Sequence, residues 1–104
     1  MTDQPARPIR FVVFHMPGPK WQQGVDYRQQ TGVSEHVQHY FNLHQQGKLQ
    51  LGGPFLLPDM GGMMVTTKEV TYEEIDAFAA EDPAVQSGLL IYEIRPWMTA
   101  MEHE

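Results

Sequence analysis

The chain has 104 residues, 41% of them hydrophobic, which is enough for one domain with a single core. It contains no cysteine, which excludes disulfides, thiolate metal sites and thiol nucleophiles, and its formal net charge of −6 argues against nucleic-acid binding. The opening MTDQPARPIR lacks the apolar segment of a signal peptide, and no apolar run is long enough for a membrane span, so we expect a cytoplasmic protein.

The first half of the chain predicts a strand, a long loop and a helix. Residues 9–16 (IRFVVFHM) are rich in β-branched and aromatic side chains, and both alternating faces of this strand are largely apolar. Residues 17–32 hold two prolines and three glycines, which predicts a loop, and loops of this length are often functional. Helical periodicity follows over residues 34–46, with Ser34 as the expected N-cap and Gly47 as the stop.

Three further strands are expected at residues 48–55, 61–67 and 88–97. The first of these should break at Gly52-Gly53-Pro54, because glycine and proline interrupt regular pairing. The last is apolar on both faces, as the first strand of the chain is.

Two helical pieces are expected between the third and fourth strands. The segment 71–82 begins with a capping box made by Thr71 and Glu74. Asp82 and Pro83 then suit the N-cap and the first position of a second, shorter helix.

The order of these elements, β-α-β-β-α-β, predicts a ferredoxin-like α+β fold: a four-stranded antiparallel sheet with both helices on one face. We expect a single domain over residues 9–98, with disordered tails at 1–8 and 99–104. Strands that are apolar on both faces need cover on the second face as well. The simplest cover is a second copy of the chain, so we predict a homodimer with the two sheets face to face, or a higher even oligomer.

The histidines of the segment SEHVQHY (34–40) raise the question of which side chains face inward. On a helical wheel, Val37, Tyr40, Phe41, Leu43 and His44 form one continuous arc, together with Val33. His36 lies inside this arc, so we expect it to be at least half buried, as a core histidine or as a functional one. His39 lies beyond the edge and is expected to be exposed, and His44 is expected to support the end of the helix.

A general base is one possible role for His36. In the first helical turn, the positive end of the helix dipole lowers the pKa of an imidazole, and a neutral imidazole is what a base needs. A metal site would need His36 and His39 together, with further ligands such as His15 and Asp82. Because the two helix histidines separate on the wheel, we expect no metal.

Several spaced segments resemble the YciI (YCII-related) family: HMPGPKW (15–21), LGGPFL (51–56), GGMMV (61–65), FAAEDPAVQSGLL (78–90) and EIRPW (93–97). The resemblance implies a ferredoxin-like dimer and an active site built on a histidine and an aspartate, which map here to His36 and Asp82. Relatives include a dehydrochlorinase, and similar dimeric barrels include muconolactone isomerase. The chain departs from shorter members by a longer first loop that carries Trp21 and Tyr27.

This resemblance gives Asp82 two compatible roles, as a helix cap and as the group that orients the imidazole of His36. No serine, threonine or cysteine stands in a nucleophile motif, which favours proton transfer over acyl-enzyme chemistry. The other candidate substrate-binding residues are His15, Trp21, Tyr40, Gly53, Pro54 and Met64. Each has a structural alternative: a strand-end histidine, packing at a dimer edge, core filling, a strand bend or an apolar wall.

Three functions remain open from the sequence. The first is a cofactor-independent enzyme that uses His36 and Asp82 for proton transfer on a small, aromatic or lactone-like substrate, as a lyase, isomerase or dehydrochlorinase. The second is a dimeric module that binds or senses a small molecule without turnover. The third is an interaction protein whose dimer surface is the function. Partners are expected to be a small molecule and a second copy of the chain, with no nucleic acid and no membrane.

Overall fold

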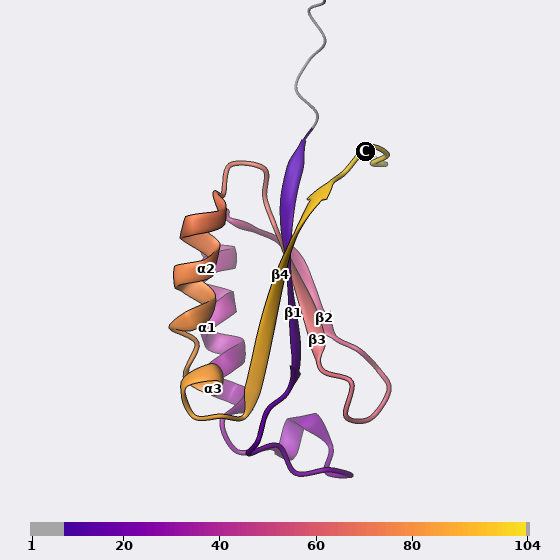
Figure 1. The fold of residues 1–104 in the computed structure, drawn as a ribbon, viewed down its shortest axis with the longest axis vertical. Helices are drawn as coiled ribbons and strands as arrows, with labels where there is room; N and C mark the ends of the chain where they lie inside the picture. Colours follow the sequence, from indigo (N-terminus) through magenta and orange to yellow (C-terminus); the bar gives the residue numbers. More distant parts are fainter. Residues whose placement is uncertain (1–7, 104) are drawn as a thin grey trace, which may run out of the picture.

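The structure, a computed structural model, describes residues 8–103. In chain order its elements are β1 (Ile9–Pro17), the 3-10 helix η1 (Tyr27–Gln29), α1 (Val33–Gln45), β2 (Leu49–Pro54), β3 (Gly62–Thr66), α2 (Tyr72–Ala80), α3 (Pro83–Gln86) and β4 (Leu90–Met98). The strands pair antiparallel in the order β2-β3-β1-β4, with α1, α2 and α3 on one side of the sheet (Figure 1). The predicted ferredoxin-like α+β fold is confirmed. Of the tail expected at residues 1–8, all but Pro8 lies outside the described residues.

The core lies between the sheet and the helices. Successive side chains of a strand point to opposite faces, and Phe11, Val13 and His15 of β1 point toward the helices. The main cluster consists of Val13, Tyr40, Leu43, Val70, Ile75 and Ala79, all nearly inaccessible to water. Burying a side chain the size of Ile75 stabilises a fold by roughly 1.5–3 kcal/mol, so this cluster positions α1 and α2 firmly on the sheet.

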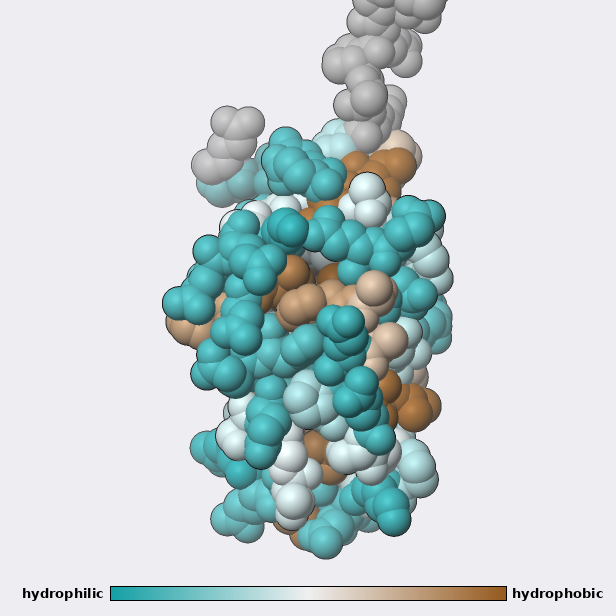
Figure 2. Space-filling model, turned by 90° about the vertical axis from the view of Figure 1, so that its left-hand side faces the viewer, coloured by the Kyte–Doolittle hydropathy of each residue, from teal (hydrophilic) through white to brown (hydrophobic). Residues whose placement is uncertain are grey.

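The outer face of the helices is polar. Figure 2 shows this side of the molecule, where hydrophilic side chains cover most of the surface and a smaller apolar area lies among them. This is the pattern of a helix layer that faces water, with its apolar stripe turned to the sheet.

No helix of residues 8–103 covers the opposite face of the sheet (Figure 1). By strand alternation and register, Ile91 and Trp97 of β4 and Leu51 of β2 point to this face. They are 49%, 48% and 58% exposed. The same register also turns Arg10, Glu93 and Arg95 to this face, so the expectation of an apolar second face on β4 holds only in part. A second copy of the chain as its cover remains a prediction.

Two expectations about the helix starts have different outcomes. The Ser34 N-cap is wrong: α1 begins at Val33, and Gly32, with a φ of 102°, precedes it. Gly32 adopts a left-handed conformation, so the helix begins one residue before Ser34. The Ser34 hydroxyl donates to the Glu35 carboxylate instead of capping the helix. At α2 the Thr71 cap is confirmed, since its hydroxyl accepts from the Glu74 N–H at 3.1 Å.

The predicted break in the second strand is also wrong. β2 continues through the glycines to Pro54, which pairs with Gly62 of β3. The backbones of the two strands approach so closely here that a Cβ on Gly62 would lie 2.5 Å from the Gly53 carbonyl oxygen. Glycine thus permits the pairing at this point and does not end it.

Part of the segment expected as a C-terminal tail is anchored to the sheet. Thr99 is buried, its N–H donates to the Pro8 carbonyl at 3.0 Å, and its hydroxyl accepts from the Arg10 guanidinium at 2.5 Å. Arg10 also forms an ion pair with Glu102, at 3.0 Å. The buried guanidinium needs these partners, which explains why the chain beyond β4 returns to β1.

Candidate functional site

A cavity of about 570 Å³ opens between α1, β2 and the loops that follow β1 and β2. Such a volume suits a small organic ligand. The cavity wall includes each residue that the sequence suggested for substrate binding, together with the candidate base: His15, Trp21, His36, Tyr40, Gly53, Pro54 and Met64. Whether these residues bind a substrate remains a prediction.

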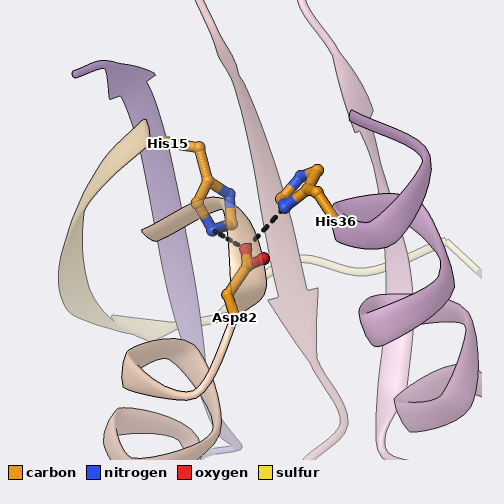
Figure 3. Close-up of side chains that lie close together, drawn as sticks. All are labelled: His15, His36 and Asp82. Carbon is orange, nitrogen blue, oxygen red and sulfur yellow. Dashed lines mark hydrogen bonds and ion pairs between the residues drawn. The ribbon is translucent and has the colours of Figure 1, made fainter. Parts of the chain in front are cut away.

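Asp82 lies at the junction of α2 and α3 and is completely buried. One carboxylate oxygen, Oδ1, accepts from the Ala84 N–H at 2.9 Å, which confirms the predicted N-cap. The other oxygen, Oδ2, lies 2.6 Å from Nδ1 of His36. The Asp-Pro start of α3 therefore fixes a carboxylate whose second oxygen is aimed at α1 (Figure 3).

This contact determines the tautomer of His36. A carboxylate can only accept, so the Nδ1–H of His36 donates to Asp82. In the neutral ring the lone pair then resides on Nε2, for which no residue among 8–103 supplies a hydrogen bond. Because His36 lines the cavity, this nitrogen is the one available to a ligand.

Several groups set the charge of Asp82. Burial alone would raise the pKa of this carboxyl, but the hydrogen bond from His36, the charge of that ring and the Ala84 N–H outweigh it. The pKa of Asp82 consequently lies below its ordinary value. An ionised Asp82 stabilises a positive charge on His36, as a base requires when it has taken up a proton.

His15, near the end of β1, is the third member of this cluster. It is 2% exposed, its Nε2 lies 3.8 Å from Oδ2 of Asp82, and its ring meets the edge of His36 with centroids 4.7 Å apart (Figure 3). Burial and then the neighbouring His36 lower the pKa of His15 to about 3, so its ring is neutral at pH 7. Neither ring nitrogen of His15 has a hydrogen-bond partner among the described residues.

Tyr40 completes the inner end of the cavity. Its ring contacts the edge of His15, with centroids 5.2 Å apart, and its hydroxyl is buried without a partner in the described part of the chain. Burial, followed by the negative charge of Asp82, raises the pKa of Tyr40, so the hydroxyl keeps its proton. Tyr40 and His15 thus present unused hydrogen-bonding groups next to His36, where a polar ligand could use them.

The same cluster is the set of residues that could hold a metal ion, because donor atoms of His15, His36 and Asp82 lie within 4.8 Å of one another. Two observations argue against a metal. The 2.6 Å separation of His36 and Asp82 is a hydrogen-bond length, shorter than the ~3 Å between adjacent ligands with metal bonds of about 2.1 Å. A metal-bound histidine normally donates its second N–H to an outer partner, and His15 has none among residues 8–103.

Other side chains of α1 differ from the wheel prediction. His39 is wrongly expected to be exposed: it is half-buried, its ring stacks on Phe78 at 3.9 Å, and its Nε2–H donates to the Phe78 carbonyl at 2.7 Å. Conversely, Val37 and Phe41 are 55% and 48% exposed, although the wheel turns them inward. The neighbours of α1 explain both errors. α2 buries the flank that holds His39, whereas the open cavity lies over Val37 and Phe41.

A model of the YCII-related domain matches residues 9–98. The chain belongs to the YCII-related domain family. The resemblance inferred from the sequence is confirmed. No curated protein is similar enough to this YCII-related chain to count as a match.

A solved structure shares the fold of this YCII-related chain. It is 5-chloro-2-hydroxyhydroquinone dehydrochlorinase (TftG) from Burkholderia phenoliruptrix, in complex with 2,5-dihydroxybenzoquinone. The TM-score is 0.58 at 23% sequence identity, over 85% of this chain and 92% of the dehydrochlorinase chain. Within residues 8–103, no helix combines the length and the apolar character that a membrane crossing requires.

Two residues near the cavity of this YCII-related chain escaped sequence reasoning. Asp59, in the β2–β3 loop, accepts a hydrogen bond from the indole N–H of Trp21 at 2.7 Å. Gln30 is 4% exposed and ties the first loop together through its side-chain amide. The Pro-Asp turn before Gly61 was a weak signal for Asp59, and a single glutamine in a loop carries none for Gln30.

Proposed function

We propose that this YCII-related protein is an enzyme that transfers a proton to and from a small molecule in the cavity. His36 acts as the base through Nε2, and Asp82 orients the ring and stabilises its protonated form. The observation that carries the proposal is the 2.6 Å contact between His36 Nδ1 and Asp82 Oδ2, which leaves Nε2 at the cavity. This chemistry needs no cofactor, because His36 and Asp82 together can both take up and return the proton.

The neighbouring residues take the roles that their chemistry allows. His15 and Tyr40 offer hydrogen bonds to an oxygen of the substrate, since both are neutral at pH 7 and hold unused polar atoms. Gly53 is paired with Met63 in the ladder between β2 and β3, so it contributes backbone surface to the cavity wall and not a free donor. Trp21, Pro54 and Met64 form apolar wall against the body of the ligand.

The wall favours a flat, oxygen-bearing substrate. Trp21, Tyr27 and Phe41 bring aromatic surface to the cavity, and the polar groups gather at one end near His36. A hydroxylated ring would place its apolar body on the aromatic side chains and its oxygen at the polar end. The chlorinated hydroxyhydroquinone named for the similarly folded dehydrochlorinase has this character and is the first substrate to test.

Loss of hydrogen chloride from such a molecule is a balanced proton-transfer reaction. His36 would first take a proton from one hydroxyl and deliver a proton to the carbon that carries chlorine. It would then take the proton of a second hydroxyl as chloride leaves with the bonding electrons, so the net loss is one proton and one chloride and the ring is left as a quinone without any oxidant. His15 and Tyr40 would stabilise the oxygen on which negative charge develops. Isomerisation of a lactone would use the same base, which takes a proton at one carbon and returns it at another.

The test is turnover of 5-chloro-2-hydroxyhydroquinone, followed by chloride release and by the absorbance of the quinone. His36→Asn is the informative variant, because the asparagine Nδ2 can replace Nδ1 as the donor to Asp82 while Nε2 is removed. We expect activity in the wild type and its loss in the variant. Equal rates in both proteins would contradict His36 as the base.

A binding or sensing module is the second candidate, and the largely apolar cavity wall favours it. Such a module would bind 2,5-dihydroxybenzoquinone or a similar ring with little change in His36→Asn, and it would turn over none of the substrates above. Calorimetric binding measured beside the turnover assay separates the two functions.

We also propose that the protein is a homodimer, in which the sheet faces that carry Ile91 and Trp97 pack together. Ile91→Glu would add a carboxylate to this face and should weaken the dimer, because a buried unpaired charge is costly. Sedimentation at micromolar concentration tests this proposal. A wild-type protein that is a single monomeric species would contradict it.

A further inference from the structure

The loop of residues 17–32, between β1 and α1, is folded more tightly than its glycines and prolines suggest. The side-chain oxygen of Gln30 accepts from the Gln22 N–H at 3.0 Å, and its amide donates to the carbonyls of Gln22 and Val25 at 2.7 and 3.0 Å. Near its start, the Gly18 N–H donates to the carbonyl of Leu89 at 2.8 Å. The loop is thus fixed at both of its ends.

Its middle is held by Asp59, which belongs to a different loop, between β2 and β3. Oδ1 of Asp59 accepts from the indole N–H of Trp21 at 2.7 Å, and the Gly24 N–H lies 3.3 Å from each carboxylate oxygen. Asp59 has a φ of 59° and is the one residue among 8–103 other than glycine with a positive φ. Such a conformation, costly for most side chains, accompanies a carboxylate that is aimed at Trp21 and Gly24 of the first loop.

The loop of residues 17–32 and the β2–β3 loop meet at Trp21, which forms part of the cavity wall. Trp21 packs on the small cluster of Ala84, Leu89 and Leu90 and also lines the cavity. Gly61, two residues after Asp59, lies against β1, where a Cβ would stand 1.8 Å from the carbonyl oxygen of His15. The loop that carries Asp59 is therefore seated on the strand that carries His15.

We infer that Asp59 is a positioning residue: its carboxylate holds the Trp21 ring as the aromatic wall of the cavity and so determines how tightly a flat ligand is bound. The part that concerns the ligand rests on the proposed function, whereas the position of Trp21 can be measured without any ligand. Asp59 acts through the indole and touches no reacting group.

The experiment compares variants of Asp59 in a Trp97→Phe background, in which Trp21 is the one remaining tryptophan. Asp59→Gly accepts the positive φ but removes the acceptor, and Asp59→Asn keeps an acceptor oxygen. Asp26→Ala is the matched control, because Asp26 is in the same loop as Trp21 and bonds Arg28 but not the indole. The readouts are the emission maximum of Trp21, its quenching by acrylamide, and the dissociation constant of 2,5-dihydroxybenzoquinone.

We expect Asp59→Gly to shift the emission of Trp21 to the red and to raise the quenching constant about twofold. Quinone binding should weaken about tenfold, because the released indole must be immobilised again when the ligand binds. Asp59→Asn should restore most of both properties, and Asp26→Ala should change neither. In a Trp21→Phe protein, which lacks the donor, Asp59→Gly should weaken binding no further.

The inference is overturned if Trp21 emission and quenching are the same in Asp59→Gly as in the parent, or if Asp26→Ala changes them equally. A parent protein that fails to bind the quinone, while Asp59→Gly still exposes Trp21, would contradict the proposed substrate class and support the positioning role. The two proposals therefore fail in different ways.

Discussion

Two regions of the molecule hold a histidine of α1 against the second half of the chain, and they differ in the polar groups that surround this histidine. In the contact between α1 and α2, His39 stacks on Phe78 and donates to its carbonyl. At the inner end of the cavity, His36 also forms one hydrogen bond, from Nδ1 to Asp82, but neither nitrogen of the adjacent His15 bonds another described residue. Among the described residues, buried polar atoms without a partner lie beside His36, whereas the Phe78 carbonyl beside His39 has its partner.

This difference separates a structural contact from a functional site. Buried polar atoms in folded proteins nearly always have a partner, so a cluster of unused ones is costly unless a ligand or water occupies it. The unused atoms here belong to His15 and Tyr40, beside the free nitrogen of His36 and at the wall of a cavity. The geometry around His39 gives no comparable reason to expect chemistry.

The largest expected effect is on turnover at the cavity end. His36→Asn should lower kcat/KM by about a thousandfold, the usual contribution of a positioned base, because the donor to Asp82 is kept and the proton acceptor is lost. Its free energy of unfolding should stay within about 1–2 kcal/mol of the wild type, measured in urea. A variant that unfolds while its residual activity per folded molecule is normal would make His36 a core residue like His39.

Asp82→Asn should have the next largest effect. The amide can still cap α3, but its NH₂ group, turned toward His36, would favour the tautomer with the lone pair on Nδ1, so Nε2 no longer accepts a proton. We expect kcat/KM to fall about a hundredfold or more, with a loss of about 1–3 kcal/mol in stability.

Asp82→Ala separates the two roles of this side chain, because it also removes the cap and should cost about 1 kcal/mol beyond Asp82→Asn. Urea unfolding of both variants measures that difference. Normal activity in Asp82→Asn would show that the carboxylate serves only as a helix cap.

The buried His15 should make the fold sensitive to acid. Its pKa is about 3 in the folded protein and about 6.5 in the unfolded chain, so between these values the unfolded state binds the extra proton. Stability is therefore full above pH 6.5 and falls by up to about 1.4 kcal/mol per pH unit toward pH 3. The depressed pKa of Asp82 acts in the same direction, since the contribution of an ionised carboxylate is lost as pH falls through its folded pKa.

Denaturant unfolding at several pH values tests this dependence. His15→Leu should flatten the curve between pH 6 and 4 (the steepest part of the window) by about the slope given above, because the variant has no ring to protonate. His103→Gln, at an exposed position, is the control and should keep the wild-type slope. An unchanged slope in His15→Leu would show that the ring is not held neutral.

Much of the fold followed from local patterns. Runs of β-branched and aromatic residues predicted the strands, and the Thr71 and Asp82 caps follow from short-range hydrogen bonds that a sequence displays directly. The pairing of His36 with Asp82 did not follow from spacing, because the two residues are 46 positions apart. It came from the family resemblance, and only the folded chain brings the two side chains together.

The failures arose where a second element decides. The wheel treats α1 as a helix with a single neighbour, so it could not place His39 against α2 or leave Phe41 facing a cavity. The contact of Asp59 with Trp21 joins two loops, and loops carry no periodic pattern that would predict their contacts. Side chains that depend on tertiary neighbours are therefore those that the sequence places least well.

The smallest expected effect tests the structural side of the comparison. His39→Phe keeps a ring to stack on Phe78 and removes the donor to its carbonyl, and His39→Gln keeps a donor in the place of Nε2 but removes the stacking. Each variant should cost about 1 kcal/mol, because a neutral hydrogen bond and an aromatic contact contribute similar amounts. Neither should change kcat/KM by more than about twofold, since His39 is turned away from the cavity. A large loss of turnover in His39→Phe with unchanged stability would mean that the contact between α1 and α2 also determines the position of His36, and the two regions would then have to be treated as one.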